Sequence, residues 1–221
     1  MTSDVPSGRR IGPTISPMNQ TEPHEMADGW GDRAATFDVL VSGSTTATGG
    51  KVVSTCTLLR DAEHAIVVDP GMVDDSGAIL TPLGALGLAP EDVTEVILSH
   101  HHPDHTLRAG LFPNAAVHDH WAIYRGSAWE DAEAEGRRIS NSVSLIRVPG
   151  HTAQDIATVA STSDGIVVLS HLWWDSDGPR EDPYAENPKE LHASRRRVLE
   201  FADVIVPGHG PPFRPSVATP R

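Results

Sequence analysis

Hydrophobic residues recur along most of this chain in short runs that are typical of β-strands. From residue 36 onward, apolar segments rich in Val, Ile, Leu and Thr alternate with polar, glycine-rich stretches. This pattern predicts strands joined by turns, with the first three expected to be antiparallel neighbours. The predicted strands are 36–43, 51–61, 64–71, 94–100, 115–118, 142–151, 155–162, 165–171 and 202–210.

Helical spacing of apolar residues is found in fewer segments, which lie between the strands. Proline, glutamate and aspartate at the start of a segment, or a proline after its end, mark the boundaries of such helices. The predicted helices are 76–88, a second piece beginning at 89–93, a short helix ended by Pro113, and segments at about 119–125 and 188–201.

The length of 221 residues is sufficient for one domain with a substantial core. Residues 1–34 are rich in Pro, Ser, Thr, Asp and Gly and show no apolar period, which predicts a disordered or mobile N-terminal arm. We therefore expect the folded domain to span residues 35–215 and a short C-terminal tail to occupy 216–221.

Composition excludes several classes of function. The net charge of −13 and the short, scattered basic clusters indicate no groove that could follow a phosphate backbone. The single cysteine, Cys56, excludes an internal disulfide and lies in a strand-like segment, where a buried, inert thiol is expected. No apolar run is long enough to span a bilayer, and Arg9-Arg10 is not followed by an apolar export segment. A cytoplasmic protein without membrane contacts is expected.

Histidines gather at the end of the predicted strand 94–100, in the sequence LSHHHPDH. His100 and His102 are two residues apart, so an extended strand end or turn can direct both toward one point. Asp104 and His105 can turn toward a second point nearby, and imidazole and carboxylate groups are good metal ligands. The alternative is a solvated, His-rich loop. Three further histidines at strand ends, His151, His171 and His209, favour a site for two adjacent metals.

These motifs together resemble those of the metallo-β-lactamase fold superfamily. The shared features are H-x-H-x-D-H at 100–105, GHT at 150–152, PGHG at 207–210 and VDPG at 68–71. The resemblance covers about residues 36–213 and is greatest to small metallo-β-lactamase domain-containing hydrolases. It implies an α+β fold, the αββα sandwich, in which two mixed β-sheets are flanked by helices and the metals lie at one edge.

The resemblance also implies which residues hold metal. One metal would be held by His100, His102 and His151, and the other by Asp104, His105 and His209. Asp69 would orient the metal loop without touching metal, although VDPG can also be read as an ordinary turn. His101 should point away from the ligands, and the superfamily places no ligand at His118 or His120.

One position departs from the superfamily pattern. Where the family supplies an aspartate that bridges both metals, this chain has His171 in LSHLWWD. A neutral imidazole uses one nitrogen toward one metal at a time, so we expect no equivalent bridge. Three outcomes are open: His171 is a terminal ligand of the second metal, one metal site is weak or empty, or Asp175 replaces the missing carboxylate. We favour the first.

The function that these features imply is metal-dependent hydrolysis. A metal-bound hydroxide would attack a small-molecule ester, lactone, thioester or amide, with Asp104 as the catalytic group that orients it and moves its proton. Zinc, as one or two ions, is the expected cofactor, with iron or manganese as alternatives. Trp173 and Trp174 follow His171 and either pack in the core or line the substrate pocket.

Two other functions stay open at this stage. One is a metal-dependent nuclease or phosphodiesterase, although the charge of −13 disfavours duplex binding without excluding short single strands. The other is a non-catalytic or redox metal-binding protein with a modified second site. The sequence also leaves a homodimer open.

Overall fold

The computed structural model describes residues 34–46 and 50–221, so the predicted arm lies outside the described residues except for its last position. Strands dominate, as predicted. The strands are β1 (Thr36–Val41), β2 (Ser44–Thr45), β3 (Val52–Val53), β4 (Cys56–Asp61), β5 (His64–Val68), β6 (Glu95–Ile97), β7 (Ala116–His118), β8 (Ala122–Arg125), β9 (Ala128–Asp131), β10 (Val143–Arg147), β11 (Ile156–Thr162), β12 (Gly165–Ser170) and β13 (Val204–Pro207). The helices are α2 (Gly77–Ala85), α3 (Pro103–Thr106) and α4 (Pro188–Leu199), with 3₁₀ turns η1 (Pro90–Asp92) and η2 (Ala109–Leu111).

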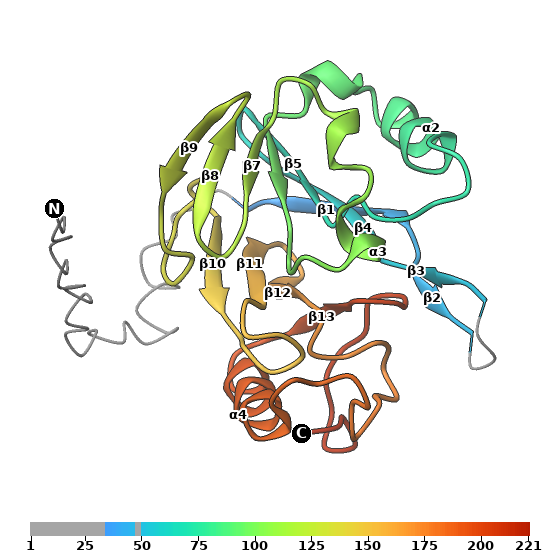
Figure 1. Cartoon of the computed structure of the whole chain (residues 1–221), viewed down its shortest axis with the longest axis vertical. Coiled ribbons are helices and arrows are strands. Elements are labelled where there is room, and N and C mark those ends of the chain that lie inside the picture. The colour runs from blue at the N-terminus through green and yellow to red at the C-terminus, as the bar shows by residue number, and fades with distance from the viewer. Residues whose placement is uncertain (1–33, 47–49) are drawn as a thin grey trace, which may run out of the picture.

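Two mixed sheets form the body of the molecule. The larger has seven strands in the order β1-β4-β5-β6-β7-β8-β9, and the smaller has four in the order β10-β11-β12-β13. In Figure 1 the two sheets lie between α2 and α4, which are at opposite ends of the molecule. The αββα sandwich is therefore confirmed. The first three predicted strands also pair as expected, since β4 is antiparallel to both β1 and β5.

Three apolar layers account for this arrangement. The central layer joins the inner faces of the two sheets and includes Leu59, Ile66, Leu145 and Ile156. A second layer packs α4 against the outer face of the four-stranded sheet, and a third packs α2 against the seven-stranded sheet. Because central strands are covered on both faces, their sequences are nearly continuous apolar runs rather than alternating ones.

The predicted helix at 119–125 is wrong, because this segment forms a turn and strand β8. The Asp119 carboxylate accepts the backbone N–H groups of Trp121 and Ala122, which is a local bond that both turns and helix starts use. The chain then reverses at Gly126, whose φ of 59° is in the left-handed region, and β9 pairs with β8. Tyr124 and Trp129 meet edge to face across this hairpin, a cross-strand contact that stabilises it.

The predicted strand 51–61 is divided into β3 and β4 by two residues with bonded hydroxyls. Ser54 Oγ donates to the Asp69 carbonyl, and Thr55 Oγ1 donates to the Gly210 carbonyl. Both bonds join this segment to loops that carry predicted site residues. The interruption of the strand thus contributes to the position of the site.

The predicted C-terminal tail is not separate from the domain. The Trp173 indole N–H donates to the Pro220 carbonyl at 2.8 Å, and Thr219 is buried. Cys56 is buried as expected, and burial raises the pKa of its thiol, which makes it unreactive. Among residues 34–46 and 50–221, no helix has the length and apolar character needed to cross a membrane.

Candidate metal centre

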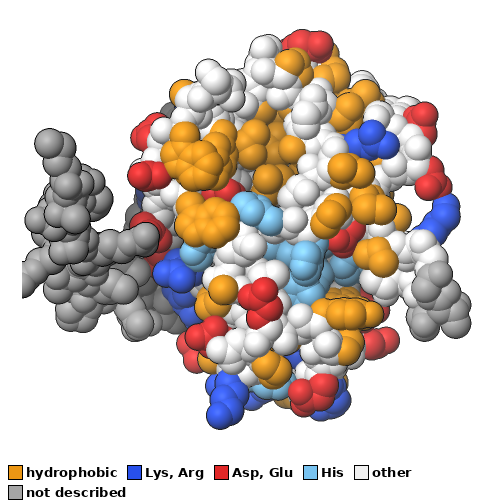
Figure 2. Space-filling model, viewed as in Figure 1, with side chains coloured by type: hydrophobic (Ala, Val, Ile, Leu, Met, Phe, Trp, Pro, Cys, Tyr) orange, Lys and Arg blue, Asp and Glu red, His pale blue; other side chains and the backbone are white. Residues whose placement is uncertain are grey.

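The seven predicted ligands come together where several strands end at one edge of the sandwich. They lie on the loop after β6 and in α3, after β10, after β12 and after β13. Histidine side chains are visible in the middle of one face of the molecule, surrounded by hydrophobic side chains (Figure 2). Within the described residues, two groups of side chains are arranged so that they could hold a metal: His100, His151 and His171, and His105, His171 and His209.

The first cluster consists of His100, His102 and His151. His102 Nδ1 lies 3.0 Å from His100 Nε2 and 3.1 Å from His151 Nε2. Such separations are close to those between neighbouring nitrogen ligands about 2.0–2.1 Å from one tetrahedral zinc ion. The three imidazoles predicted to share a metal therefore converge on one point.

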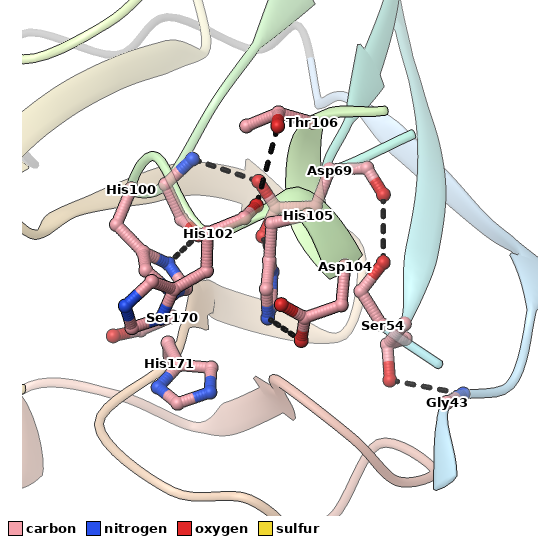
Figure 3. Close-up of polar contacts among 12 residues, drawn as sticks. Gly43, Ser54, Asp69, His100, His102, Asp104, His105, Thr106, Ser170 and His171 are labelled. Atoms are coloured by element: carbon pink, nitrogen blue, oxygen red, sulfur yellow. Dashed lines mark hydrogen bonds and ion pairs between the residues drawn. The ribbon is translucent and has the colours of Figure 1, made fainter. Parts of the chain in front are cut away.

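The second cluster consists of Asp104, His105 and His209, and His171 is close enough to share a metal either with His105 and His209 or with His100 and His151. Asp104 Oδ2 lies 3.3 Å from His105 Nε2 and 3.6 Å from His209 Nε2. His171 Nε2 lies 3.0 Å from His209 Nε2. In Figure 3 Asp104 and His105 are next to each other on α3, on the opposite side of the site from His100 and His102.

Hydrogen bonds to the remote ring nitrogens fix several imidazoles. His151 Nδ1 pairs with Asp182 Oδ2 at 2.7 Å, and His105 Nδ1 pairs with Asp69 Oδ2 at 2.9 Å. His209 Nδ1 donates to the Val53 carbonyl at 2.9 Å. When Nδ1 carries the proton, the lone pair is on Nε2, which is the atom that faces the cluster. The donor set therefore fits a cation.

Asp69 supports the metal loop from the end of β5. Its second carboxylate oxygen accepts the Ser99 backbone N–H at 2.7 Å, and its own φ is 51°. The segment that follows lies directly against α3, since a Cβ on Gly71 would overlap the Asp104 carbonyl. The Asp69 carboxylate thus contacts both the backbone of the metal loop and the predicted ligand His105.

Electrostatics distinguish Asp104 and His105 from the other side chains of the site. Burial opposes the charged form of His105, yet Asp69 and Asp104 outweigh it and raise its pKa to about 9. Burial likewise opposes the charge of Asp104, but His105 and His209 lower its pKa to about 2. Burial, assisted by His105, lowers the pKa of His209 to about 4, and it lowers the pKa values of His100 and His171 as well. Asp104 is thus ionised at neutral pH.

His171 lies between the two clusters. Its ring centroid is 4.1 Å from that of His151 and 5.0 Å from that of His209. Its Nδ1 is buried without a hydrogen-bond partner, unlike the Nδ1 atoms of His105, His151 and His209. The Asp175 carboxylate is engaged within its own loop, where its Oδ1 accepts the backbone N–H groups of Asp177 and Gly178.

The two tryptophans after His171 have different environments. Trp173 is fully buried in the core, so the expectation that it lines a substrate pocket is corrected. Trp174 is partly exposed, stacks on Tyr184 with an angle of 17° between the ring planes, and lies edge-on to His209. Only Trp174 is placed where it could contact a substrate.

The other histidines of the two motifs lie outside the clusters. His101 pairs with Asp119 at 3.0 Å, and His118 pairs with Glu95 at 2.6 Å. His120 stands edge-on to Trp121. All three belong to the region around β7 and β8 rather than to the metal clusters.

Sequence reasoning missed Asp182, which orients His151. This aspartate lies in EDPY, between β12 and α4, far along the chain from its partner. No residue spacing relates the two positions. The available signal was the number of strand-end histidines, each of which needs a partner for its remote nitrogen.

The chain belongs to the metallo-beta-lactamase superfamily, whose model matches residues 49–211. A human relative, metallo-beta-lactamase domain-containing protein 1, is 40% identical over 162 residues, which are 69% of this chain and 60% of that protein. Hydroxyacylglutathione hydrolase of Aeromonas hydrophila is 30% identical over 66% of this chain and 56% of its own length. A solved structure of a putative metallo-beta-lactamase from Thermotoga maritima has a TM-score of 0.66 at 20% identity and covers 82% of this chain and 100% of its own.

Proposed function

We propose that this protein is a metal-dependent hydrolase of a small-molecule ester, lactone, thioester or amide. The observation that carries the proposal is the convergence of the two ligand clusters, in which buried imidazoles have their remote nitrogens bonded and their other nitrogens directed inward. Membership of the superfamily and the 30% identity to a hydroxyacylglutathione hydrolase support it.

Each residue of the site has a separate role in the proposed reaction. A divalent ion held by these residues would supply Lewis-acid chemistry, lowering the pKa of water and polarising a carbonyl group. Asp104, ionised at neutral pH, orients the attacking water and accepts its proton, and is the catalytic group. Asp69 and Asp182 hold His105 and His151 in place. His171 serves as a terminal ligand in the second cluster, and Trp174 borders the substrate. Zinc is proposed as the metal, with iron or manganese as alternatives.

The test is hydrolysis by protein that has been loaded separately with zinc, iron and manganese. The substrate panel contains generic esters, lactones, thioesters, amides and phosphodiesters. We expect turnover of at least one carboxylic acid derivative that depends on metal, is lost with metal binding in His151→Ala, and is retained in His192→Ala. His192 is a suitable control because it is on α4 and bonds to the Arg221 carbonyl.

Each other result contradicts a different part of the proposal. Full metal content in His151→Ala would refute the ligand set. Hydrolysis of phosphodiesters alone would identify a nuclease or phosphodiesterase instead. Metal binding without turnover of any substrate class would indicate a non-catalytic metal protein.

A further inference from the structure

A groove lined by apolar side chains lies beside the second cluster. Its walls come from three segments of the chain: β3 and the two residues before it, the loop after β5, and the residue after α3. Its volume is about 140 Å³, which is below the range of about 300–1,000 Å³ that is usual for whole small-molecule sites, so the groove can take one substituent of a ligand rather than a whole ligand. Its lining residues are Lys51, Val52, Val53, Met72, Val73, Asp74 and Leu107, together with Gly50.

The groove exposes apolar side chains that a folded protein usually covers. Val52, Met72 and Leu107 are 43%, 40% and 59% exposed. They are three of the seven large hydrophobic residues that are exposed among residues 34–46 and 50–221. In Figure 2 hydrophobic side chains lie directly beside the histidines at the middle of the face. A gathering of this kind beside a reactive site indicates a surface that binds a ligand.

The backbone of the groove is continuous with the second cluster. The Val53 carbonyl accepts the His209 Nδ1–H at 2.9 Å, and the Met72 N–H donates to the Asp104 carbonyl at 3.1 Å. Leu107 follows α3, the helix that carries Asp104 and His105. The groove and the second cluster are therefore formed by the same segments of the chain.

Charge defines the kind of group that the groove accepts. Its two charged lining residues, Lys51 and Asp74, pair with each other at 2.5 Å on the exposed rim. No unpaired charged side chain among the lining residues is left for an ionic substituent. Burying an ionic group there would cost free energy without a compensating partner, whereas a hydrocarbon chain would remove exposed apolar surface from water.

We propose that this groove holds the apolar acyl chain of the substrate, with the scissile carbonyl at the second cluster. The inference rests on the proposed hydrolase function and narrows it to carboxylic acid derivatives with an aliphatic acyl group. Val52, Met72 and Leu107 determine this preference, and Lys51 and Asp74 close the outer rim without selecting for charge.

The first experiment measures kcat/KM of the metal-loaded protein for p-nitrophenyl acetate, butanoate, hexanoate and octanoate below their aggregation limits. We expect an increase of roughly threefold to fourfold for each methylene group that enters the groove. Leu107→Asp should flatten this dependence on chain length, and Leu107→Ala should reduce it. Val217→Asp is the control, because Val217 is 96% exposed and is not part of the groove lining, and it should leave the dependence unchanged.

The second experiment reads binding without catalysis. The methyl resonance of Met72, assigned by its loss in Met72→Leu, is followed in metal-stripped protein during addition of octanoate or acetate. We expect octanoate to shift this resonance in the wild type and in Val217→Asp, with little effect in Leu107→Asp. Acetate should not shift it in any of the three.

The outcomes separate the two proposals. Ester hydrolysis that is independent of chain length overturns the acyl groove and leaves the hydrolase function standing. Absence of hydrolysis for every carboxylic acid derivative overturns the hydrolase function, and the Met72 shift then decides whether the groove binds aliphatic chains. If octanoate does not shift the methyl resonance of Met72 in wild-type protein, the proposal of an acyl groove is wrong, whatever the result of the hydrolysis experiment.

Discussion

Replacement of Asp182 by asparagine tests whether a residue outside the sequence motifs controls the first cluster. Asp182 is buried and uses both carboxylate oxygens: Oδ2 pairs with His151 Nδ1 at 2.7 Å, and Oδ1 accepts the Tyr184 backbone N–H at 2.9 Å. Burial opposes its charge, but the bond and charge of His151 together with the Tyr184 N–H outweigh burial and lower the pKa of Asp182. Asparagine has one oxygen, so one of these two donors loses its acceptor.

The magnitude follows from that loss. A hydrogen bond to a charged group contributes about 1.5–3 kcal/mol, and removing the partner of a metal-binding histidine typically weakens metal binding by about 10–100-fold. We therefore expect Asp182→Asn to weaken the affinity of the first cluster for its metal by about 10–50-fold, because His151 is no longer held with its lone pair directed inward. The second cluster should change little, since its histidines are bonded to Asp69 and Val53.

The assay is a zinc titration of stripped protein against a chromophoric chelator, with metal content measured by elemental analysis. Asp177→Asn is the matched control, because Asp177 is an exposed aspartate of the same loop. Unchanged zinc affinity in Asp182→Asn would refute the reasoning. An equal loss at both sites would show that the substitution disorders the loop rather than releasing one imidazole.

Three further substitutions test other parts of the structure. Burial raises the pKa of Asp155 to about 6 from 3.8, so the folded state favours the protonated form, and the stability that this form provides is lost as pH rises from about 4 to 6. Asp155→Asn should remove up to about 3 kcal/mol of this pH dependence of the free energy of unfolding. Denaturant unfolding of metal-stripped wild-type and mutant protein measures it, and parallel pH profiles of the two proteins would contradict the prediction. A Cβ on Gly208 would lie 2.5 Å from His171 Cδ2, so Gly208→Ala should displace this imidazole and reduce bound metal, as measured by elemental analysis, whereas Gly84→Ala has open space and should not. His171→Asp should raise the affinity for the second metal, because an added carboxylate offsets repulsion between the two ions; calorimetry that finds an unchanged or weaker second site would refute the assignment of His171 as a ligand.

Local pattern in the sequence was sufficient to predict most strands and the ends on which ligands lie. The apolar runs of β4, β5 and β10 to β13 predicted buried strands because covered strands need apolar residues on both faces. The same signal failed at 119–125, where Asp119 forms a bond that is common to turns and helix starts. The pairing of Tyr124 with Trp129 favours a turn and strand over a helix here, and this contact forms only when β9 lies beside β8.

The sequence by itself determined the membership of the superfamily and the identity of the seven candidate ligands, because their types and spacing are local properties. Apart from Asp69, which the resemblance to the superfamily indicated, only the tertiary structure decided which groups support them. Asp182 reaches His151 across 31 positions, and the Val53 carbonyl reaches His209 across 156. It also assigned Trp173 to the core and formed the groove from Val52, Met72 and Leu107. Hydrogen bonding and burial depend on distances in space. Those distances are set by the pairing of the strands and the packing of the sheets, and the separation of two residues in the sequence does not determine them.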